Sequence, residues 1–278
     1  MNSTSPTRAL VLGGGGSTGN AWLIGLVAGL FDGGVDVTTA DLTVGTSAGA
    51  TAAVQLVGSS ATELYAEILA APPVASRPGG VVSDHLDRYR AIIASSSDLT
   101  AMRGTMGKLA LESDATERWR KMVSARFTAR QWPERSLQIT AVDAVTGEPV
   151  VFDRDSGVSL VDAVAASTSG GGSAFTIGEG RFIDGGYRSN AENADLAAGY
   201  DRVLVLSPLG GRSLHPVGWG THLAAQVDKL RANGSRVETV FPRSAVVGAD
   251  AMNHALRPEA ARSGYEDGLA LQLRQFWG

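Results

Sequence analysis

The 278-residue sequence contains no cysteine, which excludes disulfides, a thiolate nucleophile and cysteine-ligated zinc or iron–sulfur centres. A long hydrophobic run is also missing, since the longest nearly unbroken one, Ala21 to Phe31, is far shorter than the ~20 residues that span a bilayer. Residues 1–16 have only a short apolar run before a glycine cluster, so no secretory signal is expected there. These absences predict a cytoplasmic protein that is at most peripheral at a membrane.

An excess of basic residues is missing as well. The chain has 24 Lys and Arg against 28 Asp and Glu, a formal net charge of −4. Such a chain has no overall field that attracts nucleic acid, which is therefore not expected among its partners. By contrast, 44% of the residues are apolar and only 19% are charged. This composition excludes a solvated disordered chain and predicts a fold with a sizeable core.

Two short apolar segments are each followed by a glycine-containing turn and a helical pattern. The first is 9–12, ahead of the glycine loop at 13–19, and the second is 41–44, ahead of Gly45. Strand, turn and helix in this order are typical of a parallel sheet with crossover helices. Further apolar strands are expected at 182–183, 202–206 and 237–241. The sequence therefore predicts an α/β fold, a three-layer α/β/α sandwich with a mostly parallel central sheet.

We expect a single domain over residues 1–278, with its core motifs within about 9–206. Residues 71–133 include Pro72-Pro73 and Pro78-Gly79-Gly80 and are expected to form a cap-like excursion. Residues 207–278 are expected as a C-terminal extension that ends in one helix at 260–276. A β-hairpin is predicted from 137–142 and 149–152.

The segment Gly45-Thr46-Ser47-Ala48-Gly49 matches G-x-S-x-G, in which a serine lies on a tight turn between a strand and a helix. The flanking glycines leave room for closely approaching backbone. The turn exposes the serine Oγ at the edge of the sheet, and the helix N-terminus adds partial positive charge there. An ordinary turn of small residues is the alternative. The strand before it and the helix after it favour Ser47 as a nucleophile.

The glycine loop Gly13–Gly19 has two interpretations. Consecutive glycine N–H groups can point into one concavity and form an oxyanion hole for ester attack. Alternatively, Gly14, Gly16 and Gly19 fit the G-x-G-x-x-G dinucleotide pattern, with Asp36 near the spacing of a ribose-binding acid. The loop has no lysine, so the phosphate-binding G-x-x-x-x-G-K-[ST] pattern fails. The oxyanion hole is favoured because it also accounts for Ser47, while a dinucleotide-binding oxidoreductase stays open.

The base that would activate a serine is not marked by any histidine motif. The four histidines, none of which stands in a catalytic pattern, are His85, His215, His222 and His254. Asp184 ends an expected strand before Gly185-Gly186, so its carboxylate would project from a tight turn at a sheet edge. An ordinary Asp-Gly turn is the commoner explanation of such a position.

Taken in order, the glycine loop, the G-x-S-x-G segment and Asp184-Gly185-Gly186 resemble the motifs of the patatin-like phospholipase family. Thr140 to Gly147 is similar to the hairpin that precedes the aspartate in that family. The resemblance covers about residues 9–206. Three motifs in a fixed order are far more specific than any one of them.

The resemblance implies a Ser–Asp dyad without histidine, in which Ser47 attacks the acyl carbonyl and Asp184 accepts its proton. The amides of Gly14, Gly15 and Gly16, together with that of Ala48, would hold the oxyanion. The implied function is a serine hydrolase of lipid esters, of phospholipase A, lysophospholipase or carboxylesterase type, with no metal or other cofactor. Because a carboxylate with a pKa of ~4 is a weak base for a hydroxyl group, Asp184 requires either a dry setting that raises its basicity or a proton transfer concerted with the attack.

Two departures from the family pattern concern the substrate. Thr18 stands where the family has a basic residue in the glycine loop. After Ser167, the family continues with prolines and a bulky residue, whereas this sequence has Gly170-Gly171-Gly172. Three glycines would make that loop more flexible. The departures leave a catalytically silent lipid-binding relative as the alternative to an enzyme.

Overall fold

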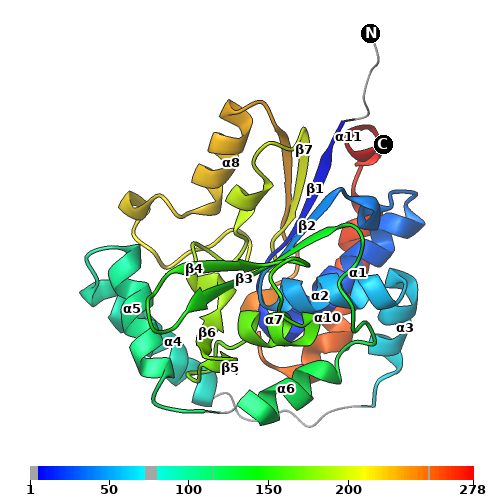
Figure 1. Cartoon of the computed structure of the whole chain (residues 1–278). Helices are drawn as coiled ribbons and strands as arrows, with labels where there is room; N and C mark the ends of the chain where they lie inside the picture. The colour runs from blue at the N-terminus through cyan, green and yellow to red at the C-terminus, as the bar shows by residue number, and fades with distance from the viewer. Residues whose placement is uncertain (1–5, 73–79, 115, 250) are drawn as a thin grey trace.

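The computed structural model describes residues 6–72, 80–114, 116–249 and 251–278 (Figure 1). In this part of the chain, eight strands form one sheet in the spatial order β5-β6-β3-β2-β1-β7-β8, with β4 beside β3. The strands are β1 (Arg8–Leu12), β2 (Leu42–Gly45), β3 (Ser136–Asp143), β4 (Pro149–Phe152), β5 (Phe175–Ile177), β6 (Gly180–Asp184), β7 (Arg202–Leu206) and β8 (Arg236–Val240).

The strands from β3 through β2, β1 and β7 to β8 are parallel, whereas β4, β5 and β6 are antiparallel to their neighbours. Leu12 pairs with both Gly45 and Leu206, so these three strands end at one level. The predicted mostly parallel sheet and the hairpin of β3 and β4 are confirmed. Because parallel strands end at the same edge, the loops after β1 and β2 are neighbours there.

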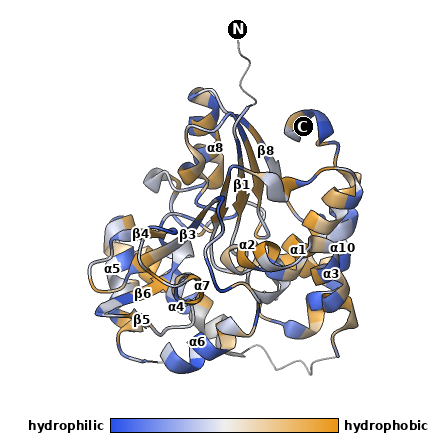
Figure 2. Ribbon diagram, turned by 45° about the vertical axis from the view of Figure 1, so that its right-hand side comes forward, coloured by the Kyte–Doolittle hydropathy of each residue, from blue (hydrophilic) through white to orange (hydrophobic). Residues whose placement is uncertain are grey.

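Helices cover both faces of the sheet (Figures 1 and 2). On one face lie α1 (Gly16–Asp32), α2 (Ala48–Gly58), α3 (Ala61–Ala70), α7 (Leu160–Ser167) and α10 (Arg257–Ala270). On the other lie α4 (Gly80–Ser95), α5 (Leu99–Ala110), α8 (Leu223–Ala232) and the 3₁₀ turn η3 (Ala194–Ala197). Along β1, Leu10 and Leu12 face the first layer while Ala9 and Val11 face the second. The three-layer α/β/α sandwich is thus confirmed.

Helix α1 is the centre of the larger layer and is buried from Ser17 to Leu30. It contacts α10 backbone to backbone: a Cβ on Gly25 would lie 2.0 Å from the Ala261 carbonyl oxygen, and one on Gly264 would lie 2.2 Å from that of Trp22. This close packing joins the C-terminal segment to the helix that follows the glycine loop.

The prediction of one terminal helix at 260–276 is wrong. The structure has α10 and a separate α11 (Arg274–Trp277), because the chain becomes extended at Leu271. The break turns the end of the chain so that Phe276 and Trp277 are buried. The Trp277 Nε1–H then donates to the Asp36 carbonyl oxygen at 3.0 Å.

The described helices of the expected excursion belong to both layers. In α5, a Cβ on Gly107 would lie 2.1 Å from the Ala144 carbonyl oxygen after β3. From α6 (Thr116–Ser124), Trp119 Nε1 donates to the Ala165 carbonyl oxygen of α7 at 3.1 Å. Pro78 and Gly79 lie outside the described residues. No helix within the described ranges is long and apolar enough to cross a bilayer.

Candidate active site

Ser47 lies on the turn between β2 and α2, where its backbone has φ 52°, a left-handed value that is uncommon for a residue with a side chain. Glycine is required at both flanking positions, because neighbouring backbone atoms leave no room for a Cβ. A Cβ on Gly45 would lie 2.7 Å from Ala50 Cα, and one on Gly49 would lie 1.9 Å from the Leu12 carbonyl oxygen. The strained turn is held in place by this packing, as in a nucleophile elbow.

Asp184 lies at the end of β6, beyond β3 from the serine, and the structure brings the two predicted residues together. Ser47 Oγ donates a hydrogen bond to Asp184 Oδ2 at 2.7 Å. The other carboxylate oxygen, Oδ1, accepts the backbone N–H of Gly186 at 2.8 Å. The Asp-Gly-Gly turn thus orients the carboxylate so that one oxygen faces the serine hydroxyl.

Burial raises the pKa of Asp184 from its ordinary 3.8 to about 6. The hydrogen bonds from Gly186 and Ser47 oppose this shift, since both favour the charged carboxylate. Gly170 closes one side of the site, because a Cβ there would lie 3.1 Å from Asp184 Oδ2. The raised pKa brings the basicity of Asp184 closer to that which proton transfer near neutral pH requires.

The glycine loop offers fewer donors than the sequence suggests. The Gly14 N–H donates to the Ala191 carbonyl oxygen at 2.8 Å, so it is not free to bind an oxyanion in this arrangement. The N–H groups of Gly15, Gly16 and Ala48 have no acceptor among the described residues. A Cβ on Gly14 would lie 3.5 Å from Ser47 Cβ, so the loop borders the serine. The candidate oxyanion hole is therefore Gly15, Gly16 and Ala48.

A buried hydrogen-bond network supports the dyad and was not found from the sequence. Asn193 Nδ2 donates to Thr46 Oγ1 and to the Gly185 carbonyl oxygen, each at 3.0 Å. It thereby joins the residue before the serine to the residue after the aspartate. Ser167 Oγ accepts the Ser47 N–H at 2.9 Å. A polar run after Asp-Gly-Gly, in a stretch that turns out to be buried, was the available signal for Asn193.

None of the described histidine side chains contacts the dyad. His215 binds Tyr89 and Thr221, and His222 Nε2 binds the His215 carbonyl oxygen. His254 Nδ1 binds Ser17 Oγ at 3.0 Å. The side chain of His85 lies outside the described part. Among the described residues there is also no cluster of three or more His, Asp or Glu that could hold a metal ion.

The dinucleotide interpretation of the glycine loop gains no support from the geometry. Asp36 lies before β2, and its carboxylate caps the 3₁₀ turn η1 (Val37–Thr39) by accepting the Thr38 N–H at 3.0 Å. A ribose-binding acid follows the second strand instead. Here that position is taken by the Ser47 turn.

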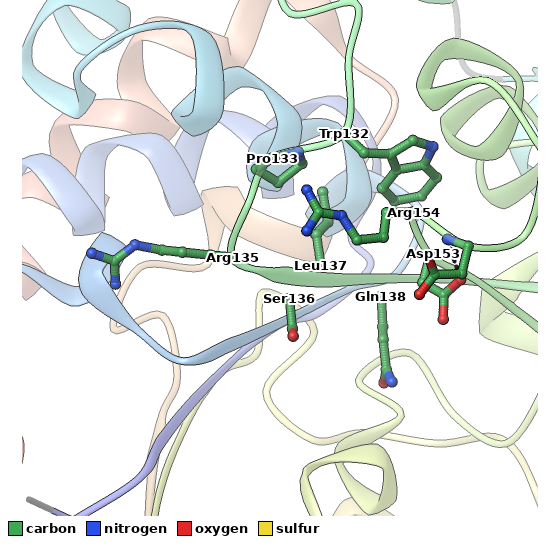
Figure 3. A pocket seen from close by; sticks show the side chains of 9 residues that line it. Trp132, Pro133, Arg135, Ser136, Leu137, Gln138, Asp153 and Arg154 are labelled. Atoms are coloured by element: carbon green, nitrogen blue, oxygen red, sulfur yellow. Dashed lines mark hydrogen bonds between the residues drawn. The ribbon is translucent and has the colours of Figure 1, made fainter.

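A surface pocket elsewhere does not include the dyad. It lies at the amino end of β3, and its lining includes Trp132, Pro133, Asp153 and Arg154 (Figure 3). The dyad lies at the opposite edge of the sheet, where β2 ends. The pocket is therefore separate from the candidate active site.

No protein-family profile matches the chain, and no curated protein sequence is significantly similar to it. Solved structures with a similar fold include the following two. VipD from Legionella pneumophila has a TM-score of 0.45 and 13% identity over 96% of this chain and 66% of VipD. The type III effector protein ExoU has a TM-score of 0.40 and 15% identity over 98% of this chain and 53% of ExoU. The chain thus spans less than two thirds of either protein, and at these scores the likeness says nothing about activity.

Proposed function

We propose that this chain is a serine acyl-ester hydrolase of the patatin-like type that acts on lipid esters. The observation that carries the proposal is the 2.7 Å hydrogen bond from Ser47 Oγ to Asp184 Oδ2. The resemblance of the three ordered motifs to the patatin-like family supports it, because each motif supplies one part of a single site. Its partners would be lipid or acyl-ester substrates, and any contact with a membrane would be peripheral.

In the proposed reaction, the Asp184 carboxylate accepts the hydroxyl proton of Ser47 as Oγ attacks the acyl carbonyl carbon. The tetrahedral oxyanion would accept hydrogen bonds from the N–H groups of Gly15, Gly16 and Ala48, each worth roughly 3 kcal/mol. As the ester C–O bond breaks, the protonated Asp184 returns the proton to the leaving alcohol.

The second half of the reaction uses the same groups. Asp184 takes a proton from water, whose oxygen attacks the acyl-serine carbon. The acyl–Oγ bond then breaks, Ser47 regains its proton from Asp184, and the carboxylic acid leaves. A single carboxylate with a raised pKa can serve in both halves, since it acts alternately as base and acid.

A fluorophosphonate probe followed by intact-mass measurement tests the nucleophile. We expect one probe mass on the wild-type chain and none on Ser47→Ala. Ser124→Ala, which changes a serine at the end of α6, is the matched control and should still be labelled. Removal of the base by Asp184→Asn should slow labelling.

Absence of the adduct from folded wild-type protein would contradict the proposal and would favour the catalytically silent lipid-binding relative. The glycines at 170–172, of which Gly171 and Gly172 have open space around them, are the feature that favours this second candidate. Binding of a fatty acid without turnover of any ester would then be its positive evidence.

A further inference from the structure

Helix α6 and the turn after it carry positive charge that the rest of the chain lacks. Residues 116–130 contain five basic side chains and one acidic side chain, a net charge of +4. The whole chain has a net charge of −4, so the remaining residues together carry −8. Although the chain as a whole has no field that attracts anions, this segment has a local one.

Helix α6 packs on the protein with one face and leaves the other exposed. On the inward face, Trp119 donates to a carbonyl oxygen of α7, and Arg120 Nε contacts a carboxylate of the same helix at 2.6 Å. Arg118, Lys121 and Met122 are exposed. Because Lys121 and Met122 follow Arg118 by three and four residues, these three side chains are neighbours on the outward face.

Arg130 adds a third basic group at the end of this helix. Its Nη2 donates to the carbonyl oxygen of Ser124, the last residue of α6, at 3.1 Å, and the residue is exposed. We call Arg118, Lys121, Met122 and Arg130 the basic face of α6. The ion pairs among the described residues include none of its three basic side chains.

Two acidic residues at the start of α6 are engaged with other groups. Asp114 Oδ1 accepts the Thr116 N–H at 2.9 Å and so caps the helix. Glu117 forms its ion pair with Arg120, on the inward face. The positive charge of the basic face is therefore left to attract an anionic partner, and this attraction should weaken as salt is added.

The basic face lies at the same end of the molecule as the proposed nucleophile. In Figures 1 and 2, α6 lies at the end opposite the start of β1, and the parallel strands β1 and β2 run toward that end. Helix α7, on which α6 packs, ends at Ser167, whose Oγ accepts the Ser47 N–H at 2.9 Å. Gln55 of α2 donates to the Arg126 carbonyl oxygen, just after α6, at 3.0 Å. An extended partner bound at α6 would therefore lie beside the edge of the sheet that carries the dyad.

We propose that the basic face of α6 docks on a lipid surface that contains anionic headgroups. This inference rests on the proposed hydrolase function, because lipid esters are found in such surfaces. Arginine and lysine are attracted to the negative surface potential, and an apolar side chain among them can enter the interface between headgroups and acyl chains. Met122, which is 45% exposed, supplies that apolar contact. A nucleic acid, the other extended polyanion, offers no apolar layer for it.

Sedimentation with vesicles of ether-linked lipids tests the docking, because these lipids contain no ester that the chain could hydrolyse. Two compositions are compared, phosphatidylcholine alone and phosphatidylcholine mixed with phosphatidylglycerol. We expect the wild-type chain to bind the vesicles with phosphatidylglycerol much more strongly and to be released from them by added salt. Arg118→Gln combined with Lys121→Gln should lower the partition coefficient about tenfold or more. Arg118→Lys, which keeps the charge, should bind like the wild type.

Lys229→Gln combined with Arg236→Gln is the matched control, because it removes the same charge from another part of the surface. Both residues are exposed; Lys229 lies in the last turn of α8, and Arg236 begins β8 at the amino edge of the sheet. This variant should keep most of the binding. An equal loss in both double variants would mean that net charge alone decides binding, and it would overturn the inference. Wild-type binding that is absent, or equal on the two compositions, would overturn it as well.

A fluorophore at Met122 reports which face meets the lipid. Because the chain has no cysteine, Met122→Cys gives a single site for a polarity-sensitive label. We expect its emission to shift to the blue on vesicles with phosphatidylglycerol, whereas a label on Asn233→Cys, at the end of α8, should not shift. Binding without a shift at position 122 would mean that another face docks, and it would overturn the inference.

A second copy of the chain is the other occupant that the basic face could have, since the remaining residues are acidic. Sedimentation velocity without lipid separates the two cases. A wild-type dimer that becomes monomeric in the variant with Arg118→Gln and Lys121→Gln would assign the face to self-association and overturn the lipid assignment. Failure of the hydrolase function would be visible separately, as absence of fluorophosphonate labelling at Ser47, which requires no vesicle.

Discussion

The glycines beside Ser47 lie in contact with backbone, whereas two of the three glycines opposite Asp184 face open space. A Cβ on Gly45 or Gly49 would overlap neighbouring main-chain atoms. A Cβ on Gly171 or Gly172 would meet nothing within 4 Å, and only Gly170 approaches the carboxylate. The serine side of the site is therefore fixed by packing, and the aspartate side is bordered by a loop with room to change.

This difference separates two roles of glycine. Beside the nucleophile, glycine allows β1, β2 and α2 to approach closely enough to hold Ser47 in its strained conformation. Beside the base, the chemistry depends on the Asp184 carboxylate, whose surroundings exclude water. Gly171 and Gly172 of the nearby loop make little contact with the rest of the site. We therefore expect substitutions on the serine side to reduce stability and activity together. On the aspartate side, the carboxylate and the loop should behave independently.

The largest expected effect is that of Asp184→Asn. The amide can still accept the Ser47 hydrogen bond but cannot take the proton, so kcat should fall by about a thousandfold or more. Measurement of kcat with a soluble ester tests this, with circular dichroism to show that the fold is kept. An activity within tenfold of the wild type would mean that another group is the base.

The substitution Gly49→Ala has the next largest expected effect. Its Cβ would lie 1.9 Å from the Leu12 carbonyl oxygen, so β1 or α2 must shift, and we expect a loss of about 3 kcal/mol in the free energy of unfolding. Urea denaturation measures this loss of stability, with Gly218→Ala as the control. Gly157→Ala is not suitable as a control, because Gly157 has a left-handed φ of 70°. Gly218 has open space around it and no left-handed φ. Equal stability of Gly49→Ala and Gly218→Ala would refute the packing argument.

A pH dependence follows from the raised pKa of Asp184. Activity should fall as the pH falls through about 6, because only the carboxylate can accept the serine proton. The folded chain also binds this proton more tightly than the unfolded chain, so the contribution of Asp184 to stability is lost as the pH rises from about 4 through about 6. Asp184→Asn should therefore be more stable than the wild type at pH 8, by up to about 3 kcal/mol, and no more stable at pH 4.

Asp201 provides a control, because its pKa is shifted in the opposite direction. Backbone and side-chain hydrogen bonds from Thr7 lower the pKa of the exposed Asp201, so its stabilisation is present at pH 8 and lost as the pH falls. Asp201→Asn should thus be less stable than the wild type at pH 8. Urea denaturation of both variants at the two pH values compares them. If both substitutions changed the stability at pH 8 in the same direction, burial could not be the cause of the pKa shift of Asp184.

Much of the fold was predictable because its signals are local. The expected strand at 202–206 coincides with β7, the one at 237–241 overlaps β8, and the strand–turn–helix order predicted the parallel sheet. Helices α3 and α5 were not identified, and the terminal helix was expected without its break. That break depends on burial of Phe276 and Trp277 against distant residues, which no local pattern contains.

The site was predictable as far as its motifs extend. Ser47 and Asp184 were found because tight turns leave glycine signatures around them, and the structure places their side chains in contact. The commitment of the Gly14 N–H to Ala191 depends on a segment far away in the sequence, as do the contacts of Asn193 and Ser167. Such contacts arise from the packing of remote segments and leave no spacing rule to follow.

The smallest expected effect lies on the open loop. Gly171 has no left-handed φ and free space at its Cβ, so Gly171→Ala should raise the free energy of unfolding by about 0.5 kcal/mol, chiefly by restricting the unfolded chain. Gly172 has equal space but a φ of 88°, so Gly172→Ala should lower it by about 1 kcal/mol. Urea denaturation distinguishes the two signs. Because neither glycine touches Asp184, kcat/KM should change little in Gly171→Ala. A large loss of activity at unchanged stability would mean that this loop contacts the acyl chain. The serine side and the aspartate side of the site would then be equally constrained.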